Sequence, residues 1–107
     1  MATFGEFLRK KRKELGMNQS QFGQNFDIIM TDISKIENGH KKFPFESLEK
    51  LAEFLKMEYS NVKNLYVADK LVDEAHKYDC PDIVFSLAES QSKYIKNKNA
   101  KQGKLAI

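Results

Sequence analysis

The chain has 107 residues, which is the length of one ordinary domain and too short for a two-domain enzyme. Hydrophobic residues make up 41% and charged residues 31%, a globular composition that excludes wholesale disorder. The balance of 18 Lys and Arg against 15 Asp and Glu leaves a net charge of only +3, so bulk charge alone does not indicate a partner.

The cysteine, histidine and hydropathy patterns argue against a disulfide-bonded, metal-binding, secreted or membrane-spanning protein. The single cysteine, Cys80, cannot form an internal disulfide, and no cysteine or histidine pair stands at metal-ligand spacing. Residues 1–12 carry charge where a signal peptide needs an apolar run, and no segment approaches the ~18 apolar residues of a membrane span. We therefore expect a cytoplasmic protein that uses no metal or cofactor and does not contact a membrane.

Apolar residues recur every third or fourth position along most of the chain, which predicts an all-α fold. The first predicted helix begins at Phe4 and is ended by Gly16, a typical C-terminal cap. Asn18 is a good N-cap for a short second helix, which carries Phe22 and Phe26 at i, i+4 spacing.

A third short helix is predicted up to Asn38 and Gly39, a helix-ending pair. Its apolar stripe, Ile29, Ile33 and Ile36, is expected to face the core. The two short helices are joined by only a few residues, which is typical of helix-turn-helix geometry.

The remaining periodic segments predict further helices over residues 45–55, 60–65, 68–75 and 81–95. The turn at residues 79–81 ends the third of these, because proline cannot continue a helix interior. We expect residues 3–66 to form a five-helix domain, residues 67–96 a C-terminal helical hairpin, and residues 97–107 a flexible tail.

If the isoleucine stripe faces inward, the third helix exposes Met30, Thr31, Ser34 and Lys35. Hydroxyls, one cation and one thioether are suited to the hydrogen-bonding groups and thymine methyls at the edges of base pairs. Periodicity alone leaves an ordinary solvated helix face as the alternative.

Residues 15–39 resemble the Cro and phage-repressor-like (XRE) helix-turn-helix family. The match consists of Leu-Gly-Met-Asn-Gln at residues 15–19, then Phe22, then Ile-Ser-Lys-Ile-Glu-Asn-Gly at residues 33–39. The resemblance extends more weakly over residues 3–66. It implies a repressor-like fold and a regulator that binds double-stranded DNA, of the kind that controls a restriction-modification cassette or a prophage.

The resemblance also implies individual roles. It assigns base reading to the exposed residues of the third helix and phosphate contacts to five further residues, Gln19, Asn38, His40, Lys41 and Lys42. Arg12 and Glu37 match a structural ion pair that links the first helix to the third. Solvation alone is the alternative for Lys41 and Lys42, and for Asp32 the alternative to base contact is a helix N-terminal acid.

Three positions depart from the family pattern. Asp27 replaces a turn glycine and must adopt a left-handed conformation, which Asp tolerates better than most residues. Ile29 replaces a serine or threonine, so the N-cap of the third helix is lost or shifted to Thr31. Gly23 stands where alanine is usual and allows close approach between helices.

Catalysis is not expected. His76 and Cys80 stand at i, i+4, but the turn at residues 79–81 separates them and no orienting group or phosphate-binding glycine loop accompanies them. Cys80 is better explained as a small hydrophobic residue at a helix junction.

The predicted hairpin carries apolar residues that the five-helix domain does not need to cover its core. We expect a homodimer through this element, with these residues at the contact: Leu71, Val72, Ala75, Ile83, Val84, Leu87 and Tyr94. Two alternatives remain open: a different protein that covers the hairpin, as a toxin covers its antitoxin, and a small effector in an apolar groove.

Overall fold

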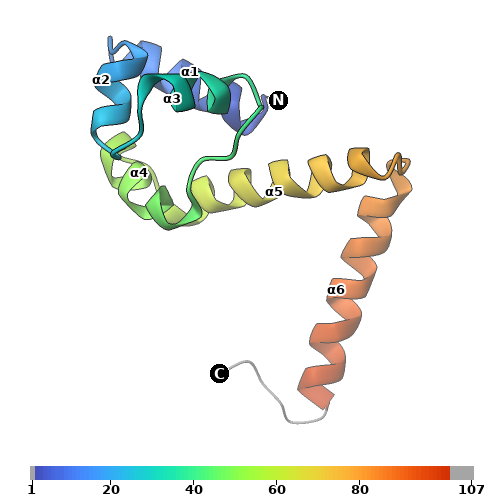
Figure 1. The fold of residues 1–107 in the computed structure, drawn as a ribbon. Helices are drawn as coiled ribbons and strands as arrows, with labels where there is room; N and C mark the ends of the chain where they lie inside the picture. Colours follow the sequence, from blue (N-terminus) through green and yellow to red (C-terminus); the bar gives the residue numbers. More distant parts are fainter. Residues whose placement is uncertain (1, 102–107) are drawn as a thin grey trace. The chain divides into compact units, whose positions relative to one another are not determined.

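The structure is a computed structural model that describes residues 2–101. This part of the chain is entirely helical, as the periodicity predicts, and the helix-turn-helix elements are followed by C-terminal helices (Figure 1). The helices are α1 Phe4–Glu14, α2 Gln19–Gln24, α3 Met30–Glu37, the 3-10 turn η1 Phe45–Ser47, α4 Leu48–Leu55, α5 Tyr59–Lys77 and α6 Ile83–Lys101. Two compact units meet within α5, between Lys70 and Leu71.

The core of the first unit is rich in phenylalanine. Phe22 of α2 and Phe26, which lies just after this helix and not on it as expected, contact each other and Phe54, and Phe26 also contacts Phe43. The rings are tilted or edge-to-face, with centroids 5.3 to 5.9 Å apart. Aromatic pairs in this geometry add to the stabilisation that comes from apolar burial. Aliphatic side chains from α1, α3, α4 and α5 complete the core: Leu8, Ile33, Ile36, Leu48, Leu51 and Val62.

Two glycines allow α3 to approach its neighbours closely. A Cβ atom at Gly23 of α2 would lie 2.1 Å from the carbonyl oxygen of Ile28, in the turn before α3, and 3.0 Å from the Ile33 side chain of α3. A Cβ at Gly5 of α1 would lie 2.4 Å from the carbonyl oxygen of Ile36. The close approach expected at Gly23 is therefore confirmed, and α3 packs against both α1 and α2 (Figure 1).

The helix ends in this unit follow the predicted signals. Gly16, with φ of 70°, ends α1, and Asn18 caps α2 through its side chain. Gly39, with φ of 81°, ends α3, and the amides of Gly39 and His40 donate to the carbonyls of Ile36 and Lys35 at 3.1 and 2.8 Å. This pair of hydrogen bonds is the Schellman motif, which satisfies the last carbonyls of a helix.

The C-terminal helices differ from the predicted boundaries. The separate helices expected over residues 60–65 and 68–75 are one helix, α5, because no glycine or proline interrupts the backbone between them. The expected junction between domains at residues 66 and 67 consequently lies inside this helix. The turn after it occurs where predicted, with Asp79 at φ of 55° and Pro81 before α6.

The last helix is longer than expected. Residues 97–101, which we predicted to be part of a flexible tail, continue α6 up to Lys101. Lysine is a good helix former and the segment contains no proline or glycine, so aperiodic hydropathy did not prevent a helix. The rest of the predicted tail, residues 102–107, lies outside the described residues.

Candidate nucleic-acid interface

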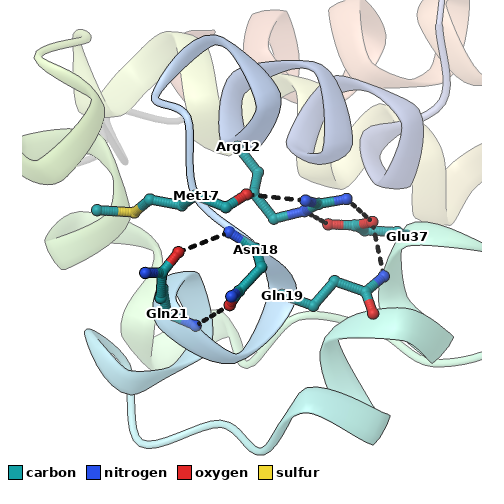
Figure 2. Close-up of polar contacts among 6 residues, drawn as sticks. All are labelled: Arg12, Met17, Asn18, Gln19, Gln21 and Glu37. Atoms are coloured by element: carbon teal, nitrogen blue, oxygen red, sulfur yellow. Dashed lines mark hydrogen bonds and ion pairs between the residues drawn. The ribbon is translucent and has the colours of Figure 1, made fainter.

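The start of α2 is fixed by a reciprocal cap. The Asn18 side chain accepts a hydrogen bond from the Gln21 amide at 2.8 Å, and the Gln21 side chain accepts one from the Asn18 amide at 2.9 Å (Figure 2). Such a capping box satisfies two backbone donors that a helix N-terminus would otherwise leave free. The next residue, Gln19, therefore has a defined position at the first turn of α2.

A buried polar network connects α1, α2 and α3. Arg12 donates from Nε and Nη2 to the two carboxylate oxygens of Glu37, at 2.6 and 3.1 Å, and from Nη1 to the Met17 carbonyl at 2.9 Å (Figure 2). Gln19 donates from Nε2 to Glu37 Oε1 at 3.1 Å. The side chains of Arg12 and Glu37 are only 10% and 2% exposed. Of the two partners of Glu37, Arg12 also bonds to the α1–α2 connection at Met17 and Gln19 lies on α2, so the network fixes the register of α3 against α2.

The outward face of α3 carries the side chains that the sequence placed there. Ile33 and Ile36 are buried in the core, whereas Met30, Thr31 and Lys35 are exposed and Ser34 is half-buried. The exposed face thus offers one thioether, two hydroxyls and one ammonium group over about one and a half turns of helix.

Ile29 does not face the core, and our expectation for it is wrong. The residue is 67% exposed, and its backbone, with φ of −72° and ψ of 156°, is extended rather than helical. Because Ile29 is the N-cap residue, the 3.6-residue period that aligns Ile33 and Ile36 does not apply to it. The N-cap of α3 has no side-chain hydrogen bond, so the cap is lost and not transferred to Thr31. The turn before it uses Asp27 at φ of 56°, the left-handed conformation that the sequence required.

The basic residues after α3 divide into two groups. Lys41 forms an ion pair of 2.9 Å with Asp32, which lies in the first turn of α3, so Lys41 stays beside the exposed face of that helix. Lys42 instead pairs with Asp69 of α5 at 3.1 Å. Asn38 and His40 are exposed at the end of α3.

Asp69 is a positioning residue that the sequence did not reveal. Besides Lys42, its carboxylate accepts a hydrogen bond of 3.1 Å from the Phe4 amide at the first turn of α1. The contact spans 65 positions of sequence, so no local pattern could have found it.

Several other features of the sequence have an ordinary structural explanation. Residues 9–13 are all basic, and the exposed cations of this run, Arg9, Lys10 and Lys13, share a surface of α1 with Glu6 and Glu14. Within residues 2–101, no three acidic, histidine or cysteine side chains gather where they could hold a metal ion. Over the same residues, no helix is both long and apolar enough to cross a membrane.

The second unit exposes many apolar side chains. Leu71, Ile83, Leu87 and Tyr94 are 55 to 65% exposed, Val72 is 40% exposed and Ala75 is buried. The end of α5 and the start of α6 also line an apolar groove with Leu71, Ala75, Tyr78, Val84, Phe85 and Ala88.

A helix-turn-helix unit whose second helix presents a polar outer face defines the class of this protein. The chain belongs to the helix-turn-helix domain family, whose model matches residues 5–67, and the resemblance seen in the sequence is confirmed at that level. Among curated proteins, it is similar to the HTH-type transcriptional repressor RghR of Bacillus subtilis (strain 168), with 34% identity over 82 residues. The alignment covers 76% of this chain and 58% of that repressor, so the chain spans little more than half of its relative. No solved structure matches the chain significantly.

Proposed function

We propose that the chain is a sequence-selective DNA-binding regulator of transcription that places α3 in the major groove. The observation that carries the proposal is the polar outer face of α3, held in register by the buried network of Arg12, Glu37 and Gln19. In helix-turn-helix proteins the second helix of the motif enters the major groove with its N-terminal residues toward the base edges. Met30, Thr31, Ser34 and Lys35 are then the base-reading residues, with Lys35 donating to guanine O6 and N7.

Phosphate contacts come from the two ends of the motif. Gln19 lies at the N-terminus of α2, where backbone amides and the helix dipole favour an anion. Asn38, His40 and Lys41 follow the recognition helix and are exposed. Lys41 and Lys42 are both ion-paired, with Asp32 at 2.9 Å and with Asp69 at 3.1 Å, so we expect each to contribute only part of its charge to a phosphate contact. Such contacts position the protein on the duplex without reading its sequence.

The active species is a homodimer formed through the second unit. Exposed apolar side chains on both α5 and α6 support this proposal, because burying them against a second copy removes apolar surface from water. Two subunits related by a two-fold axis read two half-sites of a pseudo-palindromic operator.

Repression is the direction of regulation that we propose. A dimer bound at an operator blocks access to a promoter by occupancy alone, and the relative from Bacillus subtilis is named a repressor. No catalytic step is part of this function.

A mobility-shift titration tests the proposal. The protein is titrated against genomic fragments, including the region upstream of its own gene, at two salt concentrations. We expect selective shifts whose affinity falls steeply with salt, because bound lysines release counterions from the phosphates. Weak and unselective binding even at low salt would contradict the proposal.

A protein-interaction module is the second candidate. The exposed apolar groove and helix faces of the second unit favour it, since large apolar patches often mark partner sites. It predicts a monomer that binds no operator and that forms a stoichiometric complex with a partner protein through α5 and α6.

A further inference from the structure

Two exposed apolar side chains stand at the N-terminal end of α3. Ile29 is 67% and Met30 is 55% exposed, and together with Ile28, Ser20, Gln24 and Asp27 they line an open hollow between α2 and α3. Single exposed apolar residues are common on protein surfaces. Two adjacent ones at the start of a recognition helix call for a physical explanation.

Ile29 conflicts with two local rules of protein structure. As the N-cap of α3 it supplies no side-chain hydrogen bond, where Ser, Thr, Asp or Asn would stabilise the helix. As an apolar residue it remains in water, so its side chain contributes little to the core. Residues that lower stability without a structural return are expected at functional sites.

The position of the pair points to a specific ligand group. The N-terminal residues of a recognition helix approach the edges of base pairs. In the major groove the C5-methyl of thymine is the apolar group that a side chain can contact. We propose that Ile29 and Met30 contact thymine methyl groups, so that thymine at the matching positions of each half-site determines specificity. This inference rests on the DNA-binding function proposed above.

The surroundings of the pair favour DNA over a protein surface. The apolar area is small and bordered by polar side chains, those of Ser20, Gln24 and Thr31. Asp27 lies in the same hollow, and its negative charge disfavours a phosphate there, which directs the hollow to bases rather than to the backbone. Further along the same helix, Lys35 is an exposed cation that attracts the polyanion, whereas the charge of Lys41 is balanced by Asp32.

Deoxyuridine scanning tests the inference. In a duplex that carries the selected operator, each thymine is replaced in turn by deoxyuridine, which removes the methyl group and leaves base pairing unchanged. Loss of one methyl contact is expected to weaken binding about three- to fivefold at one or two positions of each half-site. The Ile29→Ala variant should lose this sensitivity at one of these positions. Val67→Ala, which shortens an exposed apolar side chain on α5, should retain all of it.

The Ile29→Ser variant separates a functional role from a folding defect. Serine restores a side-chain cap, so the melting temperature should equal or exceed that of the wild type, while discrimination between thymine and uracil is lost at the position that Ile29 contacts.

Three results would overturn the inference. They are an operator without thymine in the half-sites, a scan without effect, and methyl sensitivity that persists in both Ile29→Ala and Met30→Ala. In each case selective DNA binding by the wild type would still support the proposed function, and Ile29 and Met30 would become candidates for a protein contact. Failure of the wild type to select any DNA would instead refute the proposed function.

Discussion

At the scale of single residues, the Arg12–Glu37 pair has the largest structural role. Its charges lie almost out of water, and each is satisfied by several hydrogen bonds, including those from Gln19 and to Met17. Removing one member leaves the other charge buried without its partner, which is the expensive case for an ion pair. Both ends of the helix-turn-helix motif would lose their common anchor.

We therefore expect Arg12→Ala to lower the free energy of unfolding by roughly 3–5 kcal/mol. Thermal or urea unfolding measures this change, and Lys13→Ala, an exposed neighbour on α1, is the matched control. An unchanged melting temperature accompanied by lost DNA binding would show that Arg12 contacts DNA and does not primarily support the fold.

Tyr66 makes the stability of the first unit depend on pH in the alkaline range. Burial raises the pKa of the Tyr66 hydroxyl above its usual value, the charge of Lys42 lowers it, and the charge of Glu46 raises it. The hydroxyl donates a hydrogen bond to the Phe43 carbonyl, which requires the protonated form. Because the folded state holds this proton more tightly than the unfolded state, its contribution to stability is complete below the unfolded pKa of about 10 and is lost as pH rises through the folded value.

The stability difference between the wild type and Tyr66→Phe should therefore be constant from neutral pH to about pH 9 and shrink above about pH 10. At neutral pH we expect the variant to be less stable by about 1 kcal/mol, from the lost hydrogen bond. Unfolding measured across this pH range checks both statements. A difference that grows at high pH would contradict the assigned direction of the pKa shift.

At the scale of single helices, the predicted helix ends can be compared directly with the observed ones. One end each of α1, α2 and α3 could be predicted, because the positive φ of Gly16 and Gly39 and the capping side chain of Asn18 act on the backbone immediately beside them. The exposed position of Ile29 could not be predicted. An apolar stripe with the helical period assumes a helical backbone, and Ile29 lies just outside the helix. The single helix α5 was divided in our prediction because its apolar pattern weakens, although nothing in the sequence breaks the backbone there.

The contact between α2 and α3 predicts that Gly23→Ala lowers stability, which is the opposite of what helix propensity predicts. Alanine is the better helix former by up to about 1 kcal/mol, so propensity alone predicts that Gly23→Ala stabilises α2. The added Cβ would meet the Ile28 carbonyl oxygen at 2.1 Å and the Ile33 side chain at 3.0 Å, and the first of these is backbone. We expect a net loss of about 1–3 kcal/mol from overpacking, measured by urea unfolding.

Gln24→Ala is the matched control for this substitution, because Gln24 is on the same helix and exposed. It should leave stability nearly unchanged. A Gly23→Ala variant as stable as this control would mean that α2 and α3 are not held as closely as the structure indicates.

At the scale of the whole molecule, the proposed dimer requires that exposed apolar side chains of the second unit are buried against a second copy of the chain. Leu87 is 55% exposed on α6, and Asn99, twelve residues further along the same helix and about 120° around it, is also exposed. A charge introduced at an apolar dimer contact must be desolvated, whereas a charge that stays in water costs little.

Leu87→Glu should shift the protein toward monomer in sedimentation equilibrium and weaken binding to a two-half-site operator more than binding to one half-site. Asn99→Glu adds the same charge away from the stripe of Ile83, Leu87 and Tyr94, and it should leave the association state unchanged. A Leu87→Glu protein that sediments as the wild type does would remove Leu87 from the proposed dimer contact.

The central claim is that the outer face of α3 reads base pairs, and the affinity of Lys35→Ala for selected and for random duplexes tests it most directly. A base-reading lysine predicts a loss of about 1–3 kcal/mol on the selected sequence, little change on random DNA and relaxed preference at one position. Equal loss on both duplexes, accompanied by a salt slope lower by about one, would assign Lys35 to a phosphate and contradict the account.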